Sequence, residues 1–329
     1  IQFSTSFYIA WFFTLILLIW GVVLFAKREW RSEMLRVAPI HSVGERRVLF
    51  FSIAVSVVSL IPFLWIYWPA LRELPQRQYA EVFPMVPRLH SWLWMGDSNW
   101  LWGRLARWLP FHELPLYWEH QIGVGAFLSV SWLLIVGSTF MRPKFTPYKI
   151  RAAVIGLLLI NLIALKIPGA GSPWYLVYKL IPGAKGIRAV SRYVIVWLFP
   201  FSILIGWFWQ TFITQKLASF AKTLFFALVV VTLFGVEQFG SVQNYSLKSE
   251  SERMEKLRDE AGSLLRGCLS FYALQGPGVN IPPWELHVDA MLLSAMIGLP
   301  TLNGYSGANP PKWDPVSYTH LTLPTNREV

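Results

Sequence analysis

Long apolar runs constrain this chain more than any other feature of its sequence. A helix of roughly 20 apolar residues matches the hydrocarbon thickness of a bilayer. Six runs reach or approach that length, at about residues 6–26, 49–69, 122–141, 152–167, 194–214 and 223–239. The fourth run is short and contains Lys166, whose amine would have to extend to the headgroups. The pattern predicts an α-helical integral membrane protein, with about six transmembrane helices in a polytopic domain over residues 1–239.

Composition agrees with this fold class. Only 14% of the residues are charged and 54% are hydrophobic, whereas a soluble domain carries about 25% charged residues. The net charge of +11 does not indicate a nucleic-acid partner, because the basic residues gather in short loops between apolar runs. The single cysteine, Cys268, excludes an intramolecular disulfide. We expect no nucleic-acid partner and no cofactor.

The distribution of Lys and Arg predicts the orientation. These residues are much denser in loops 27–48, 142–151 and 215–222 than in loops 70–120 and 168–193. Cytoplasmic loops carry the excess of positive charge in membrane proteins. The first set of loops is therefore expected in the cytoplasm, and the second set outside, together with the segment after residue 240.

The loop 70–120 is rich in tryptophan, a residue that prefers the headgroup level of a bilayer. Leu101, Leu105 and Trp108 recur at helical spacing, with Arg104 and Arg107 beside them. This spacing predicts a short helix lying in the interface. Two interpretations stay open: a structural loop that lies on the membrane, or a platform beside a groove for a lipid substrate.

The stretch "HELPLYWEH" places His112, Glu113, Glu119 and His120 close together. His and Glu can bind metal ions. Their spacing matches no metal-binding motif, so no metal site is predicted. Glu119 also precedes the third apolar run, where the positive end of a helix dipole would stabilise a carboxylate.

The character of the chain changes after Gly240. Residues 246–265 are charged and helix-forming, "CLSFYAL" reads as a buried strand, and residues 282–298 read as a second helix. "PTLNGYSG" reads as a strand or turn, in which Asn303, Gly304 and Gly307 would form a structural turn. This order predicts a partial, small, extracytoplasmic α/β domain over residues 240–315.

Both ends of the chain are abrupt. The chain begins at Ile1, a few residues before an apolar run, and is interpreted as a fragment of a longer protein. The last stretch, residues 316–329, continues no preceding pattern. It resembles a translated sequencing adapter, which would place the end of the natural sequence near Pro315.

The loop "PGAKGIRAVSRYV" carries three cations between two apolar runs: Lys185, Arg188 and Arg192. Arg188 and Arg192 are four residues apart, so a helix continuing into the fifth run would present both on one face. Pro182 and Gly183 would let the backbone turn tightly before them. The arginines could bind ordinary lipid headgroups, an acidic partner in loop 70–120, or the phosphate of a substrate, to which Lys185 would add only diffuse attraction.

Three stretches support a family resemblance: "YLVYKLIPGAKGIRAVSRYVIV", "YWEHQIGVGAFL" and "PTLNGYSGANPPKW". Over about residues 70–315 the chain resembles large bacterial polytopic proteins, which are described either as uncharacterised or as members of the C-type membrane glycosyltransferase superfamily.

The resemblance implies transfer of a sugar from a polyprenyl-phosphate-linked donor to an acceptor outside the bacterial cytoplasmic membrane. It places the catalytic carboxylate in a first outer loop, upstream of Ile1, so no catalytic residue is assigned in this chain. The expected partners are membrane lipid and the lipid-linked sugar. The alternative is a non-enzymatic scaffold, or a subunit that handles lipid-linked glycans.

Overall fold

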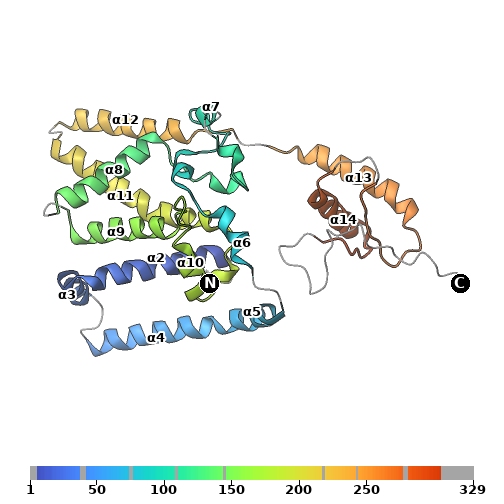
Figure 1. Ribbon diagram of the computed structural model, residues 1–329, viewed down its shortest axis with the longest axis horizontal. Helices are drawn as coiled ribbons and strands as arrows, with labels where there is room; N and C mark the ends of the chain where they lie inside the picture. The colour runs from blue at the N-terminus through green and yellow to red at the C-terminus, as the bar shows by residue number, and fades with distance from the viewer. Residues whose placement is uncertain are drawn as a thin grey trace. The chain divides into compact units, whose positions relative to one another are not determined.

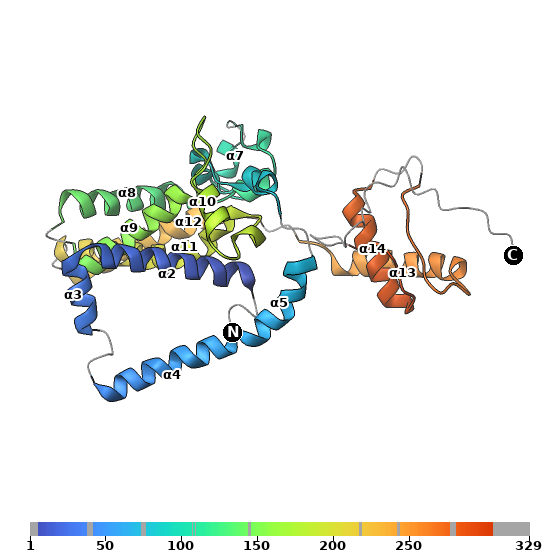
Figure 2. The same ribbon diagram turned by 60° about the horizontal axis from the view of Figure 1, so that its bottom comes forward.

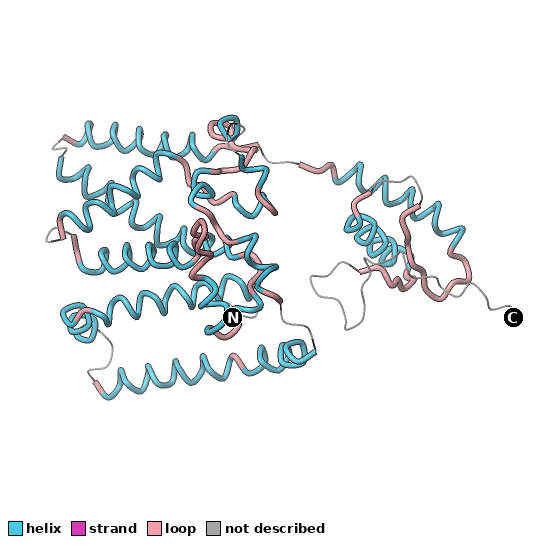
Figure 3. The backbone as a smooth tube through the Cα atoms, viewed as in Figure 1, coloured by secondary structure: helices cyan, strands magenta, loops and turns pink. Residues whose placement is uncertain are grey.

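A computed structural model describes residues 6–37, 42–73, 77–106, 108, 110–143, 146–216, 219–241, 244–276 and 281–304. These residues are mostly helical, and Figure 3 shows no strand among them. The chain divides into two compact units. The first comprises residues 1–69 and 76–242, and the second comprises residues 70–75 and 243–329.

The first unit is a helical bundle (Figures 1 and 2). Its α-helices are α2 (Phe7–Ala26), α3 (Arg28–Val37), α4 (Val43–Ser59), most of α5 (Ile61–Glu73), α6 (Tyr79–Val82), α7 (Gly103–Ala106), α8 (Ala126–Met141), α9 (Tyr148–Ile163), α10 (Trp174–Leu180), α11 (Tyr193–Lys216) and α12 (Phe220–Gln238). Helices α2, α8, α9, α11 and α12 pack on one another. Short 3-10 turns occur at η1 (Phe83–Met85), η2 (Leu89–Leu93), η3 (Pro110–Glu113), η4 (Tyr117–His120), η5 (Ala184–Gly186) and η6 (Val190–Arg192).

The bundle is held together by large side chains that face one another across α2, α9 and α11. Phe12, Leu157 and Phe201 are almost completely buried in one continuous apolar cluster. Gly156 on α9 lets α2 approach, because a Cβ at this position would collide with the ring of Trp20. Small residues at helix crossings allow this kind of close packing in membranes.

The outward faces of the bundle helices are also apolar. Leu18 and Val22 on α2 and Phe225 on α12 are more than half exposed. Contiguous exposed apolar surface of this kind marks an interaction with lipid or protein. Among the described residues, α2, α12 and the segment Val190–Phe212 are long and apolar enough to cross a membrane. The structure therefore supports a helical membrane-associated protein.

The prediction of six spans is not supported. The run 49–69 divides at Leu60, which ends α4 before α5 begins. The run 122–141 enters its helix late, at Ala126, because Gly125 adopts a φ of 97° in the preceding loop. The run 152–167 leaves its helix after Ile163. Helices α4, α8 and α9 are thus shorter than the roughly 20 residues that a helix needs to cross the hydrocarbon core of a bilayer.

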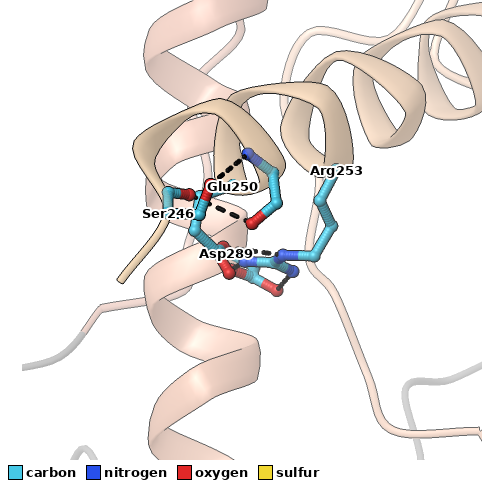
Figure 4. A network of polar contacts seen from close by, with 5 residues as sticks. Ser246, Glu250, Arg253 and Asp289 are labelled. Atoms are coloured by element: carbon cyan, nitrogen blue, oxygen red, sulfur yellow. Dashed lines mark hydrogen bonds and ion pairs between the residues drawn. The ribbon is translucent and has the colours of Figure 1, made fainter. Parts of the chain in front are cut away.

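The second unit contains α13 (Leu247–Leu264) and α14 (Pro283–Ile297), the two helices that the sequence predicts there. Arg253 on α13 joins the two helices, donating to both oxygens of Asp289 on α14 at 2.7 and 2.9 Å and to Glu250 at 2.9 Å (Figure 4). These hydrogen bonds raise the pKa of Arg253. Ser246 caps the start of α13 by accepting from the Ser249 N–H.

The α/β prediction for this unit is not supported. The two expected strands meet only at an isolated parallel bridge between Phe271 and Thr301, and the described residues contain no sheet. A strand pair needs a regular ladder of backbone hydrogen bonds. Here two backbone hydrogen bonds join the segments at Phe271, and the Asn303 side chain adds two more by bonding both the N–H and the C=O of Ala273.

Candidate functional site

Loop segments cover one end of the bundle, which is the right-hand end of the first unit in Figure 1. They comprise the described residues of 77–125, which leave out 107 and 109, and residues 164–192. Hydrogen bonds between these segments hold the layer together. Lys166 donates its backbone N–H to the Pro87 oxygen at 2.7 Å, and the Tyr178 hydroxyl donates to the Arg77 oxygen at 2.6 Å. This layer contains all the cations that the sequence places in the candidate site.

The turn at residues 182–183 is held against the start of α2. The indole N–H of Trp11 donates to the Pro182 oxygen at 2.9 Å. Gly183 adopts a φ of 80°, in the left-handed region that favours glycine, and a Cβ there would lie 2.9 Å from the Trp11 nitrogen. Lys185 follows on η5 with an exposed side chain.

Arg192 forms an ion pair with Glu119. Its Nη2 lies 2.6 Å from one carboxylate oxygen and its Nε lies 3.2 Å from the other, so the ion pair is bidentate. Glu119 also accepts from the Ser191 hydroxyl at 3.4 Å. The Glu119 side chain is only 13% exposed, against 51% for Arg192. The arginine therefore compensates a largely buried carboxylate. Of the three partners that the sequence leaves open for Arg192, the structure shows the acidic residue in loop 70–120.

Arg188 differs from Arg192 in its surroundings. Its backbone N–H donates to the Tyr8 hydroxyl at 2.8 Å, and its side chain is exposed. Among the described residues no carboxylate pairs with its guanidinium. The two arginines do not share a helical face, because α11 begins only at Tyr193 and Arg188 lies in the irregular segment before η6. The spacing of four residues therefore does not place Arg188 and Arg192 on one helical face.

Residues of the first apolar run take part in this site, and sequence reasoning missed them. Tyr8 and Trp11 lie within the run 6–26, whose sequence predicts only a membrane span. Tyr8 binds the Arg188 backbone, and its ring lies 5.7 Å from the Arg192 guanidinium carbon. Their position in the sequence could have indicated this role. Tyr and Trp side chains have one polar atom that usually finds a hydrogen-bond partner, and these two lie in the first turns of a span.

The four residues of "HELPLYWEH" do not converge. His112 approaches Asp97 at 3.3 Å, whereas His120 is fully buried between the Ser91 hydroxyl at 3.1 Å and the Pro84 oxygen at 2.9 Å. Burial lowers the pKa of His120, so its ring is neutral near pH 7. Within the part of the chain that the structure describes, no three His, Cys, Asp or Glu side chains come close enough to hold a metal ion.

The expected interfacial helix is a single turn, α7, and Arg107 lies outside the described residues. Trp108 is 85% exposed. In contrast, Trp94 is fully buried and stacks on Phe111 at a centroid distance of 4.9 Å. The tryptophans of this loop therefore have two roles: some build the loop's own core and others face outward.

The turn predicted in the second unit is only partly described, since Gly307 lies outside the described residues. Asn303 is 5% exposed and acts through its side chain. Gly304 does not adopt a positive φ and has open space around it. The conformational freedom expected of the Asn303-Gly304 pair is therefore not used at Gly304.

No family model, curated protein or solved structure matches this chain. The resemblance to the C-type glycosyltransferases stays a prediction, and the site is interpreted from its own geometry.

The Arg192–Glu119 pair gives a first testable prediction. Arg192→Ala leaves a mostly buried carboxylate without its cation, so we expect a loss of about 1–3 kcal/mol in the free energy of unfolding. The double variant Arg192→Ala/Glu119→Gln should recover part of that loss, because the uncompensated charge is gone. Unfolding titrations in mixed micelles would measure both. Equal stability of the single variant and the parent chain would contradict the assignment.

Proposed function

We propose that this chain is part of a bacterial inner-membrane glycosyltransferase that takes a polyprenyl-phosphate-linked sugar at the extracytoplasmic face. Apolar helices long enough to cross a bilayer support the membrane location. The sparse Lys and Arg in loops 70–120 and 168–193 support placing the site layer and the second unit outside. The resemblance described above supports the reaction class.

The observation that carries the proposal is the exposed side chain of Arg188. It lies beside a tight turn at the end of a membrane bundle, and no carboxylate among the described residues neutralises it. An arginine presents a planar fork of donors that matches phosphate oxygens. A phosphate at headgroup depth could meet this fork while its polyprenyl chain stays in the bilayer.

The fork also suits the chemistry of transfer. The bond between the anomeric carbon and the phosphate oxygen breaks as the acceptor oxygen bonds to the sugar, so negative charge grows on the departing phosphate. Donors placed at developing charge contribute most to such catalysis. Arg188 would hold the leaving phosphate, and no residue of this chain is assigned as the base that receives the acceptor's proton.

Arg188→Lys tests the proposal because it keeps the charge and removes the fork. We expect it to weaken binding of a short-chain polyprenyl phosphate at least tenfold, the equivalent of one lost charge-assisted hydrogen bond. Lys185→Ala should change the affinity less than threefold. Arg192→Lys should mainly lower stability, since the fork of that arginine holds Glu119. Titration of the detergent-solubilised chain with the labelled phosphate would measure the affinities.

Similar, mild losses of affinity from all three substitutions would mean that only net charge matters. That result would reject a phosphate clamp at Arg188. Unchanged affinity in Arg188→Lys would reject it as well.

A further inference from the structure

The end of the bundle opposite the layer of loop segments carries an amphipathic helix, α3. Lys27 ends α2 in an extended conformation, with φ −102° and ψ 123°, and its oxygen accepts the Arg31 N–H at 3.0 Å as α3 begins. Figures 1 and 2 show α3 turning across the axis of α2 instead of continuing it. Because α2 is long and apolar enough to cross a bilayer, α3 would lie along the bilayer surface.

Trp30 holds α3 against the bundle. Its side chain is 3% exposed and packs in one apolar cluster with Val23 on α2 and Ala152 on α9. A tryptophan buried to this extent contributes a large apolar contact area. Burial of this ring fixes the rotation of α3 about its own axis, and therefore determines which of its other side chains face outward.

The outward surface of α3 separates basic from acidic side chains. Arg28, Arg31 and Leu35 are exposed, and their spacings of three and four residues place them on one helical face. Glu29 and Glu33 are four residues apart and lie on another face. A face that combines arginines with an exposed leucine suits a bilayer surface, where the leucine can enter the acyl region while the arginines reach the headgroups.

Two further cations contact the buried ring of Trp30. The Lys27 Nζ lies 4.7 Å and the Arg151 guanidinium carbon lies 5.2 Å from the centre of that ring. Lys27 ends α2 whereas Arg151 lies in the first turn of α9, so the fold brings the two together. The ring attracts both cations but has no net charge to neutralise them. Among the described residues, no carboxylate forms an ion pair with either of them, or with Arg28 or Arg31.

We propose that a basic cluster, formed by Lys27, Arg28, Arg31 and Arg151, binds the headgroups of anionic phospholipids. Like charges held close together repel one another, and a bound anion removes that cost. Clusters of Lys and Arg next to a membrane span, or on an amphipathic helix at the bilayer surface, attract anionic lipid. The planar guanidinium groups match phosphate oxygens, and the acyl chains would lie beside Leu35. The cluster lies at the opposite end of the bundle from Arg188, so lipid would bind here whether or not the chain transfers sugars.

Fluorescence anisotropy of the full chain in neutral detergent tests the proposal, with a tail-labelled phosphatidylglycerol as the probe. We expect saturable binding that Arg28→Gln/Arg31→Gln weakens about thirtyfold, because each cation near an anionic headgroup contributes roughly fivefold in affinity. Both side chains are exposed, so the variant should still fold. Arg151→Gln should weaken binding about fivefold, and tests the cluster from a separate helix. The same label on phosphatidylcholine should bind at least about tenfold more weakly.

Two double variants separate this cluster from the net charge of the chain. Lys248→Gln/Lys256→Gln removes the same charge from α13 in the second unit, and in physiological salt it should change the affinity less than about twofold. Glu29→Gln/Glu33→Gln adds two units of positive charge on the acidic face of α3, and should raise the affinity less than about threefold. A rise as large as the fall in Arg28→Gln/Arg31→Gln would mean that only net charge matters, and would overturn the proposal.

Equal affinity for the two lipid probes would also overturn the proposal, and so would unchanged affinity in both Arg28→Gln/Arg31→Gln and Arg151→Gln. Displacement of the label by a polyglutamate peptide at a lower concentration than by unlabelled phosphatidylglycerol would overturn it in favour of an acidic protein partner. Weakening by Arg188→Lys, instead of by the variants of the basic cluster, would place the lipid at the layer of loop segments. That result would overturn this proposal and leave the proposed function intact.

Discussion

Glu237→Ala should lower the free energy of unfolding by about 2–4 kcal/mol, because two N–H donors lose their acceptor and each unsatisfied buried donor costs about 1–3 kcal/mol. Glu237 is 5% exposed near the end of α12. Its two oxygens accept the Phe127 N–H at 2.9 and 3.0 Å, and one of them also accepts the Trp102 indole N–H at 3.2 Å. The substitution would leave both donors without a partner in a dry environment.

The carboxylate also completes the start of α8. The first backbone N–H groups of a helix have no partner within it. The residue before α8 is Gly125, which has no side chain to cap them. A negative charge at this end is stabilised further by the helix dipole. Glu237 therefore links α8, α12 and the loop that carries Trp102.

Matched variants separate the charge from the shape. Glu237→Gln keeps the size and one acceptor oxygen, so we expect a smaller loss of about 1–2 kcal/mol. Val236→Ala, at a neighbouring exposed position of α12, should cost less than about 1 kcal/mol. Unfolding titrations in mixed micelles would measure all three. A loss for Glu237→Ala no larger than that for Val236→Ala would refute the capping role.

This contact shows what the sequence could and could not predict. A carboxylate at the start of the third apolar run was expected from the sequence, and Glu119 was the nearest one along the chain. The structure gives that place to Glu237, which is more than a hundred residues away, and pairs Glu119 with Arg192. Local spacing identifies the need for a partner, but tertiary packing selects the residue that meets it.

The same limit applies to the bundle and its loops. The length of the apolar runs predicted α2, α11 and α12, because a long apolar run is a local property of the chain. It overestimated the run 152–167, where the chain leaves the helix after Ile163 and Lys166 bonds the distant Pro87.

Asn303→Ala should lower the stability of the second unit by about 2–4 kcal/mol. The side-chain oxygen of Asn303 accepts from the Ala273 N–H at 2.7 Å and the Thr301 hydroxyl at 2.9 Å. Its amide nitrogen donates to the Ala273 oxygen at 3.0 Å and lies 3.2 Å from the His287 ring nitrogen. Alanine would leave buried partners unsatisfied on two segments at once, and each such group costs about 1–3 kcal/mol.

The neighbouring glycine provides the control. Gly304 has open space around it and no positive φ, so Gly304→Ala should change stability by less than about 0.5 kcal/mol. Hydrogen exchange of the full chain, followed at the amides of residues 271–273 and of α14, would report the second unit separately from the bundle. Faster exchange in Asn303→Ala alone is the expected result. Similar acceleration in both variants would mean that the turn's backbone conformation, and not the Asn303 amide, holds these segments together.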